Sequence, residues 1–205
     1  RHQKTRKMSS HTETRKLAAV VFADIEGYTA LFQRDEAAAM RQVLSHRKGL
    51  EELSRKNHGE IIQFYGDGSV TIFASVIDAI QSSIALQTLS MQQSIPIRIG
   101  IHMGDLVYKD HDIFGDVVNV TSRIQSAGIA GSILVSKKVA DELKNHPEIK
   151  CQPIGKFSLK NVGEELDLFA LTGSGLKVPP LHKPIKKNTF YSTRTYLFLL
   201  VLIAA

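Results

Sequence analysis

Apolar positions recur along the chain with two different periods, and each period predicts a different kind of element. The run at 17–23 is apolar throughout, which is typical of a buried strand. In the stretch 34–57 apolar residues recur every three or four positions between charges, which predicts a long amphipathic helix, and 76–91 has the same helical spacing. Between these helices, 61–65 and 69–73 are rich in β-branched and aromatic residues and predict the strands of a hairpin.

The second half of the chain continues this pattern with shorter elements. Residues 97–104 alternate as a strand after Pro96, and residues 116–127 have helical spacing between glycines. Further predicted elements are a strand at 132–136, a helix at 137–144 and a strand at 166–171. The order strand-helix-strand-strand-helix-strand at the front resembles a ferredoxin-like arrangement. We therefore predict an α+β, palm-type fold in which an antiparallel sheet has helices packed on it.

Composition and charge narrow the class of protein. A chain of 205 residues with 43% hydrophobic residues fits one globular domain with tails. The formal net charge of +6 comes from the two ends, and residues 17–176 carry a net charge of −4. This mildly acidic centre argues against a nucleic-acid-binding domain. Cys151 is the only cysteine, which excludes an internal disulfide and a thiolate zinc cluster.

Two aspartates stand at the ends of predicted neighbouring strands. Asp67 lies between Gly66 and Gly68 in the hairpin turn, where glycines allow positive φ on both sides of the carboxylate. An aspartate in a hairpin turn is common and alone says little. Asp24, however, ends the apolar run at 17–23 in a similar way. Two carboxylates at neighbouring strand ends predict a site for a hard cation such as Mg²⁺ or Mn²⁺.

The predicted helix 116–127 carries two polar side chains on one face. Asn119 and Arg123 are four residues apart and lie beside the apolar stripe of that helix. They could present an amide to a sugar and a charge to a phosphate, or Arg123 could simply pair with a carboxylate. Asp112 precedes this helix on an extended segment, and Lys160 lies near a later turn, where lysines are usually just solvated.

Four segments in order resemble the catalytic domain of the class III nucleotidyl cyclases, the adenylyl and guanylyl cyclases. They read FADIEGYT at 22–29, YGDG at 65–68, RIGIHMG at 98–104 and DIFGDVVNVTSR at 112–123. The resemblance covers about residues 17–172. It implies two Mg²⁺ (or Mn²⁺) ions per site, held by Asp24, Asp67 and the carbonyl of Ile25. We also expect the backbone N–H groups of Gly27, Tyr28 and Thr29, at a helix start, to bind phosphate.

The same resemblance implies roles for the later residues. Asn119 would orient the ribose, Arg123 would stabilise the transition state, and Lys160 would hold the triphosphate. In this family these three come from one subunit and the metal aspartates from the other. We therefore expect a head-to-tail homodimer with two shared active sites.

The base-reading positions depart from the family pattern. Asp112 matches one of them, whereas the other, usually lysine, is Gln63, and an arginine that contacts the triphosphate in some members is replaced by Asp105. The Gln63 amide can donate to adenine N1 while Asp112 accepts from N6, and guanine O6 would face Asp112 badly. Guanine could still be accommodated in a shifted pose.

These residues predict an adenylate cyclase that converts ATP to 3′,5′-cyclic AMP and pyrophosphate in signal transduction. A guanylate cyclase that uses GTP is the first alternative. A catalytically silent, nucleotide-binding regulatory module is the second, and the presence of Asp24, Asp67, Asn119 and Arg123 disfavours it. A diguanylate cyclase would require a different hairpin from the YGDG at 65–68.

The two ends of the chain have a different composition from the predicted domain. Residues 1–16 are expected to form a basic lead-in, and 173–195 a basic linker. The segment 196–205 is apolar except for Tyr196, but a membrane span requires about 20 such residues. Because basic residues precede it, we expect it to begin a transmembrane helix that tethers a cytoplasmic catalytic domain to the inner face of a membrane.

Overall fold

The computed structural model describes residues 14–109, 112–158, 165–173 and 175–181. Among them, eight strands form one sheet with the order β2-β3-β1-β4-β6-β8-β7, and β5 pairs with β4 outside this path. The strands are β1 (Thr14–Ile25), β2 (Glu60–Tyr65), β3 (Gly68–Phe73), β4 (Ile97–Lys109), β5 (Asp112–Phe114), β6 (Ile133–Ser136), β7 (Lys150–Ser158) and β8 (Glu165–Thr172). The helices are α1 (Tyr28–Arg34), α2 (Glu36–Lys56), α3 (Val76–Gln92), α4 (Asp116–Ser126) and α5 (Lys137–Glu142), followed by a 3-10 turn, η1 (Leu143–Asn145).

Strand β1 is the central element because it pairs with β4 over its whole length and with β3 from Ala19 to Ala23. Val21 lies opposite Thr71 of β3 on one side and Ile101 of β4 on the other, both in antiparallel register. Its side chains are buried on both faces of the sheet, as Val20 and Val21 illustrate. The order β2-β3-β1-β4 is that of the predicted ferredoxin-like arrangement, which confirms the predicted fold class.

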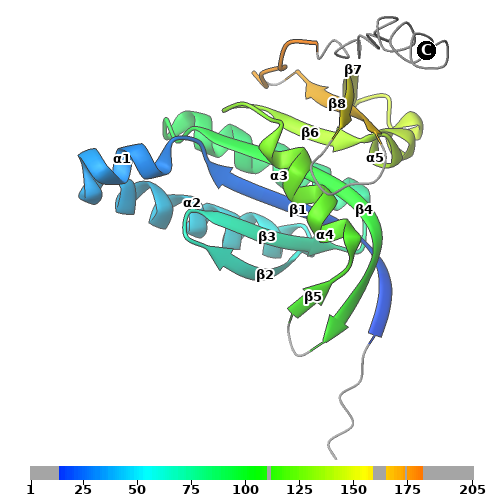
Figure 1. Ribbon diagram of the computed structural model, residues 1–205, viewed down its shortest axis with the longest axis horizontal. Coiled ribbons are helices and arrows are strands. Elements are labelled where there is room, and N and C mark those ends of the chain that lie inside the picture. The colour runs from blue at the N-terminus through cyan, green and yellow to red at the C-terminus, as the bar shows by residue number, and fades with distance from the viewer. Residues whose placement is uncertain (1–13, 110–111, 159–164, 174, 182–205) are drawn as a thin grey trace, which may run out of the picture.

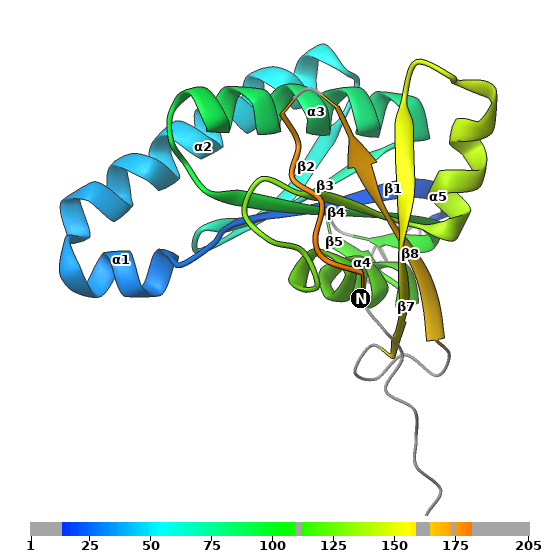
Figure 2. The same ribbon diagram turned by 90° about the horizontal axis from the view of Figure 1, so that it is seen from above.

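Helices cover the two faces of the sheet unequally. Figure 2 shows α2 and α3 on one face and α4 on the other. The largest apolar cluster lies under α2 and α3 and includes Ile80, Leu86, Ile97 and Ile101. In Figure 1, α4 lies in front of β1 and β4, while β2 and β3 have no helix in front of them.

Helix α4 lies unusually close to β4, because β4 has glycines beneath it. A Cβ on Gly100 would collide with the backbone nitrogen of Gln125, and one on Gly104 would come within 3.3 Å of the Val117 side chain. Close packing of this kind fixes the height and the rotation of α4 over the sheet. The polar face of α4 is therefore held at a defined position relative to β1.

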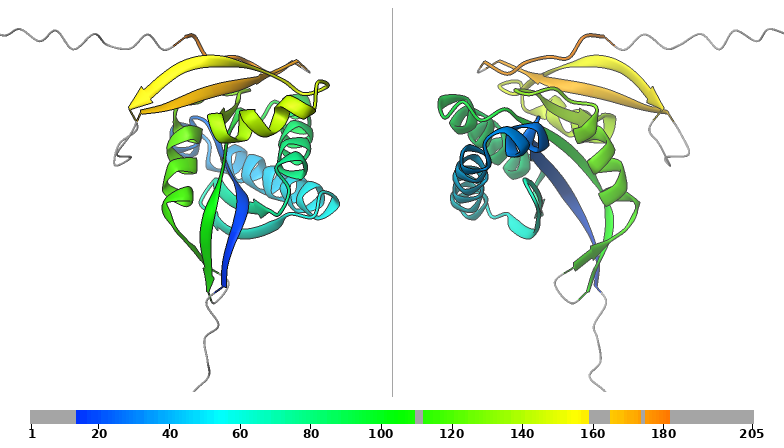
Figure 3. Two further views of the ribbon diagram at one scale, coloured as in Figure 1. Left: turned by 90° about the vertical axis from the view of Figure 1, so that its right-hand side faces the viewer. Right: turned by 60° about the vertical axis from the view of Figure 1, so that its left-hand side comes forward.

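The predicted helices at 34–57, 76–91 and 116–127 are confirmed with small changes at their ends. Strand β7 was not predicted, because Pro153 and Gly155 interrupt its alternation of apolar and polar residues. The β7–β8 register shifts between these two residues. Figure 3 shows the β7–β8 hairpin at the far end of the sheet. Strand β1 begins at Thr14, inside the stretch predicted as a lead-in.

The start of the predicted linker lies against the domain. The backbone N–H of Lys177 donates to the carbonyl of Gly131 (2.9 Å), and Leu176 packs against the main apolar cluster. Within the described ranges, no helix has both the length and the apolar character that crossing a membrane requires. The predicted membrane segment 196–205 lies outside the described residues and stays a prediction.

Candidate functional site

The β2–β3 turn carries Asp67 toward the end of β1. Of the two glycines that allow positive φ beside Asp67, Gly66 adopts it (φ 58°), whereas Gly68 begins β3. One carboxylate oxygen of Asp67, Oδ2, accepts a hydrogen bond from the backbone N–H of Ile25 (3.2 Å). Because Ile25 directly follows Asp24, this bond fixes the two predicted metal-binding aspartates beside each other.

Asp24 is held from the opposite side by an arginine of β4. Arg98 Nε donates to Asp24 Oδ1 (2.8 Å) and Arg98 Nη2 donates to Asp24 Oδ2 (3.0 Å), which makes a two-pronged ion pair. The two residues face each other directly in the β1–β4 register, and each side chain is 25% exposed. The hydrogen bonds to Asp24 raise the pKa of Arg98. Arg98 was part of a recognised motif, but the sequence alone assigned it no partner.

The surroundings of Asp67 disfavour its charged form. Burial is the main cause that raises the pKa of Asp67, and the negative charge of Asp24 adds to it. Hydrogen bonds from backbone N–H groups and the positive charge of Arg98 act in the opposite direction. Two carboxylates held this close repel each other, and a divalent cation between them would relieve the repulsion, so the pair is an electrostatic site for a cation.

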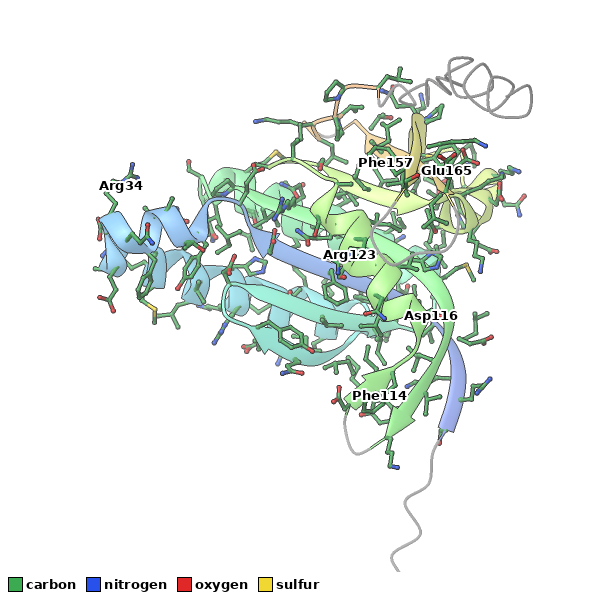
Figure 4. All side chains as sticks on the ribbon, viewed as in Figure 1. Arg34, Phe114, Asp116, Arg123, Phe157 and Glu165 are labelled. Carbon is green, nitrogen blue, oxygen red and sulfur yellow. The ribbon has the colours of Figure 1, made fainter. Side chains whose placement is uncertain are left out.

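A cavity of about 440 Å³ opens in front of these carboxylates and is walled by α4. Asp24, Asp67, Asn119 and Arg123 all lie on its wall. Figure 4 shows Arg123 on α4, in front of the central strands. The remaining lining residues are Phe22, Ala23, Tyr65, Gly68, Ser69, Val118, Ser122, Gln125 and Ser126. One chain thus brings four of the sequence-predicted site residues to one cavity.

The donors present suit Mg²⁺ or Mn²⁺ better than a metal that requires a closed protein cage. Among the described residues, no group of three or more His, Cys, Asp or Glu side chains could hold a metal. Two carboxylates without a third protein side chain are typical of Mg²⁺ sites, in which water and substrate phosphates complete the coordination. The carbonyl of Ile25 as a further ligand stays a prediction.

The predicted phosphate-binding turn lies just beyond Asp24 but does not line the cavity. Gly27 takes a left-handed conformation (φ 76°) before α1, and no side chain caps this helix start. The ring of Tyr28 packs near that of Phe32, with 5.8 Å between centroids. The role of Gly27, Tyr28 and Thr29 in binding phosphate therefore stays a prediction.

The two predicted base-reading residues are exposed and lie outside the cavity wall. Gln63 on β2 pairs with Val70, which packs in the apolar cluster beneath α4. Because paired residues share a face of the sheet, Gln63 points to the face that holds Asp24. Asp112 begins β5, where its Oδ1 accepts from the N–H of Ile113 (2.9 Å). Lys160 lies outside the described residues.

Curated relatives of this chain include named cyclases. The chain is 30% identical over 171 residues to a Rhizobium meliloti protein provisionally named adenylate cyclase 3, with 79% of this chain and 29% of that protein aligned. It is 31% identical over 182 residues to the germination-specific adenylate cyclase of Dictyostelium discoideum, with 77% and 20% aligned. The chain therefore spans less than a third of the length of either relative.

Solved structures share the fold. The adenylyl cyclase CyaB from P. aeruginosa superposes with a TM-score of 0.72 at 26% identity, covering 80% of this chain and 97% of that one. The guanylate cyclase domain of RhGC from Catenaria anguillulae, solved in complex with GTP, has a TM-score of 0.67 at 19% identity, covering 78% and 98%. At that identity the second likeness concerns the fold alone. The family described as the adenylate and guanylate cyclase catalytic domain matches residues 11–173, which is most of the chain, so the protein belongs to this family.

Proposed function

We propose that the protein is an adenylate cyclase that converts ATP to 3′,5′-cyclic AMP and pyrophosphate. The observation that carries this proposal is that Asp24, Asp67, Asn119 and Arg123 all lie on the wall of one cavity. The wall combines two carboxylates for cations, an amide for a hydroxyl group and a guanidinium for a phosphate. A nucleoside triphosphate requires all three kinds of contact.

Cyclisation is an in-line attack of the ribose 3′ oxygen on the α-phosphorus, which expels pyrophosphate. Asp24 and Asp67 would hold two divalent cations. These cations would lower the pKa of the 3′ hydroxyl group and neutralise the negative charge of the phosphates. Asn119 holds the ribose so that its 3′ oxygen faces the α-phosphorus. Arg123 donates to the α-phosphate as charge develops there, and removal of one such donor costs on the order of 3 kcal/mol, or about a hundredfold in kcat.

The preference for ATP rests on Gln63 and Asp112. Both lie at exposed positions, where they can meet a base presented outside the cavity wall. A neutral amide that donates to N1 and a carboxylate that accepts from N6 together match adenine. The two relatives compared above carry adenylate cyclase names, which favours the same substrate. GTP remains the alternative, because the fold is also that of a guanylate cyclase domain.

We further propose that two copies share their active sites head to tail. The side of the sheet that α4 leaves uncovered carries Tyr65, whose side chain is 51% exposed. Large exposed aromatic side chains are typical of interfaces. In such a dimer the cavity walls of the two copies would face each other. Asp24 and Asp67 of one copy would then act with Asn119 and Arg123 of the other copy rather than with those of their own chain.

Product identification tests this function. The chain is incubated with ATP or GTP and Mn²⁺, and the cyclic product is identified by chromatography. We expect cyclic AMP from the wild type and from Asp167→Asn, a control on β8 at the other end of the sheet. If cyclic GMP were the only product, the substrate would be GTP and the assignment of ATP would be wrong. Nucleotide binding without any cyclic product would establish the silent regulatory module instead.

A further inference from the structure

Arg47 of α2 contacts the turn that carries Asp67, and the proposed chemistry gives this arginine no role. Arg47 Nη2 donates to the carbonyl of Gly66 (2.7 Å), the residue that directly precedes Asp67. On the basis of the proposed function, we propose that Arg47 is a positioning residue. It braces this turn and so holds the Asp67 carboxylate where it binds a divalent cation.

The turn depends on such a brace because the strand pairing with β1 ends before it. The β1–β3 pairing stops at Ala23 opposite Ser69, and β2 is an edge strand of the sheet. Gly66 has a left-handed conformation (φ 58°), and a Cβ built on it would meet no described atom within 4 Å. The described hydrogen bonds that tie the turn to other elements come from Arg47 and from the N–H of Ile25.

The guanidinium of Arg47 is itself held by an aromatic ring of the hairpin. Its Cζ lies 4.8 Å from the centroid of the Phe64 ring, and Phe64 packs against the main apolar cluster under α2 and α3. Figure 1 shows the turn between β2 and β3 next to α2. Stacking on the ring together with the bond to the Gly66 carbonyl therefore fixes the guanidinium relative to the hairpin.

Arg47 acts on Asp67 through the backbone rather than through its charge. Burial is the main cause that raises the pKa of Asp67, and the described charges that act on it are those of Asp24 and Arg98. Arg47 does not line the cavity either. What it can change is therefore the place of the Asp67 carboxylate, and not the charge balance of the site or the room for a nucleotide.

The competing explanation is that Arg47 merely ties α2 to the hairpin and stabilises the fold. Its Nε is buried and has no hydrogen-bond partner among the described residues, which lowers the net stability that the contact provides. A purely structural contact would affect unfolding and leave Asp67 in place as long as the protein is folded. Positioning predicts changes at the Ile25 N–H and in cation binding.

The first measurement follows the hydrogen bond that reports where Asp67 lies. Hydrogen exchange of the Ile25 amide is measured by NMR in the full chain, because this N–H donates to Asp67 Oδ2. In Arg47→Met, which removes the donor and keeps an apolar side chain, this exchange should be roughly fivefold faster. The amide of Val21, in the middle of β1, should exchange as in the wild type. Arg41→Met, at an exposed arginine of the same helix, is the control and should change neither amide.

The second measurement follows the cation and uses 3′-deoxy-ATP, which lacks the attacking hydroxyl group. Its dissociation constant is measured by calorimetry in Mn²⁺ and in EDTA, and the ratio gives the gain in affinity due to the cation. For Arg47→Met we expect this gain to fall about tenfold, with the affinity in EDTA unchanged. Arg41→Met should keep the wild-type gain.

The two measurements together separate the explanations. Wild-type exchange at Ile25 or a wild-type gain in Arg47→Met would overturn the positioning role. Faster exchange at Val21 as well as at Ile25 would also overturn it, because the variant would then be generally less stable. Absence of any gain in the wild type would instead contradict the metal site of the proposed function, and exchange at Ile25 would still decide whether Arg47 braces the turn.

Discussion

His46 of α2 is a buried imidazole that takes no part in the proposed chemistry. Its side chain is 2% exposed, and neither ring nitrogen has a hydrogen-bond partner among the described residues. Burial lowers the pKa of His46 to about 4, while the charge of Asp24 raises it and that of Arg47 lowers it. The fold therefore holds His46 neutral at pH 7.

This residue predicts a loss of stability on acidification. The unfolded chain binds the proton near pH 6.5 and the folded chain near 4, so stability present at neutral pH is lost as pH falls through this window. The difference amounts to about 3 kcal/mol for a fully buried group. His46→Leu should flatten the dependence of the urea midpoint on pH, whereas His58→Gln, at a largely exposed histidine, should not. Identical slopes in His46→Leu and the wild type would contradict this origin.

Asp67 gives the second prediction at this scale. Asp67→Ala should abolish turnover, by at least about a thousandfold, because one of the two carboxylates proposed to bind the cations is lost. Since burial raises its pKa, folding does not favour the ionised carboxylate, and the substitution removes only its hydrogen bonds with backbone N–H groups, such as that of Ile25. The free energy of unfolding should therefore change by about 1 kcal/mol. Steady-state kinetics in Mn²⁺ and urea unfolding check both parts, and near wild-type turnover would rule out a site made by Asp24 and Asp67.

Among the elements, α4 determines where Asn119 and Arg123 lie. Its position depends on two glycines of β4 that differ in what a methyl group would meet. At Gly100 the obstacle is the backbone of Gln125, and at Gly104 it is the side chain of Val117. A backbone atom cannot move aside without displacing the helix, whereas a side chain can.

Gly100→Ala should therefore displace α4 and reduce kcat at least about tenfold, with a loss of about 2–3 kcal/mol in stability. Gly104→Ala is the matched variant on the same strand and should cost less than half as much in both measurements. Kinetics and urea unfolding of the two variants decide this. Equal effects would show that the close approach of α4 at Gly100 does not position Arg123.

The sequence predicted elements better than it predicted their contacts. Apolar periodicity located β1, α2, α3 and α4, because each presents a face to the core at its own period. The alternation of β7 is broken by Pro153 and Gly155, so no pattern was visible there. The pairing of Arg98 with Asp24 depends on strand register across 74 residues, which local patterns do not encode. The resemblance named Asp24, Asp67, Asn119 and Arg123, but only the fold brought them to one cavity.

At the scale of the whole molecule, it can be tested whether one copy of the chain or two contribute the residues of each active site. A single chain lines its cavity with both sets of residues, yet the proposed dimer draws them from opposite copies. Asp24→Ala and Arg123→Ala should each be inactive alone. When the two are mixed and allowed to exchange, a heterodimer would contain one intact site, so activity should return to roughly a quarter of the wild-type value, as expected for random exchange. An inactive mixture with heterodimers demonstrated by mass spectrometry would assign the site to a single chain.

The central claim is that this site cyclises ATP, and the most direct measurement compares kcat/KM for ATP and GTP in the wild type and in Gln63→Lys. We predict that the wild type prefers ATP. A charged donor at this position would strengthen the bond to adenine N1 by about 1 kcal/mol or somewhat more, so Gln63→Lys should raise the ATP-over-GTP ratio about tenfold. An unchanged ratio would show that Gln63 does not contact the base. A wild type that prefers GTP would contradict the account.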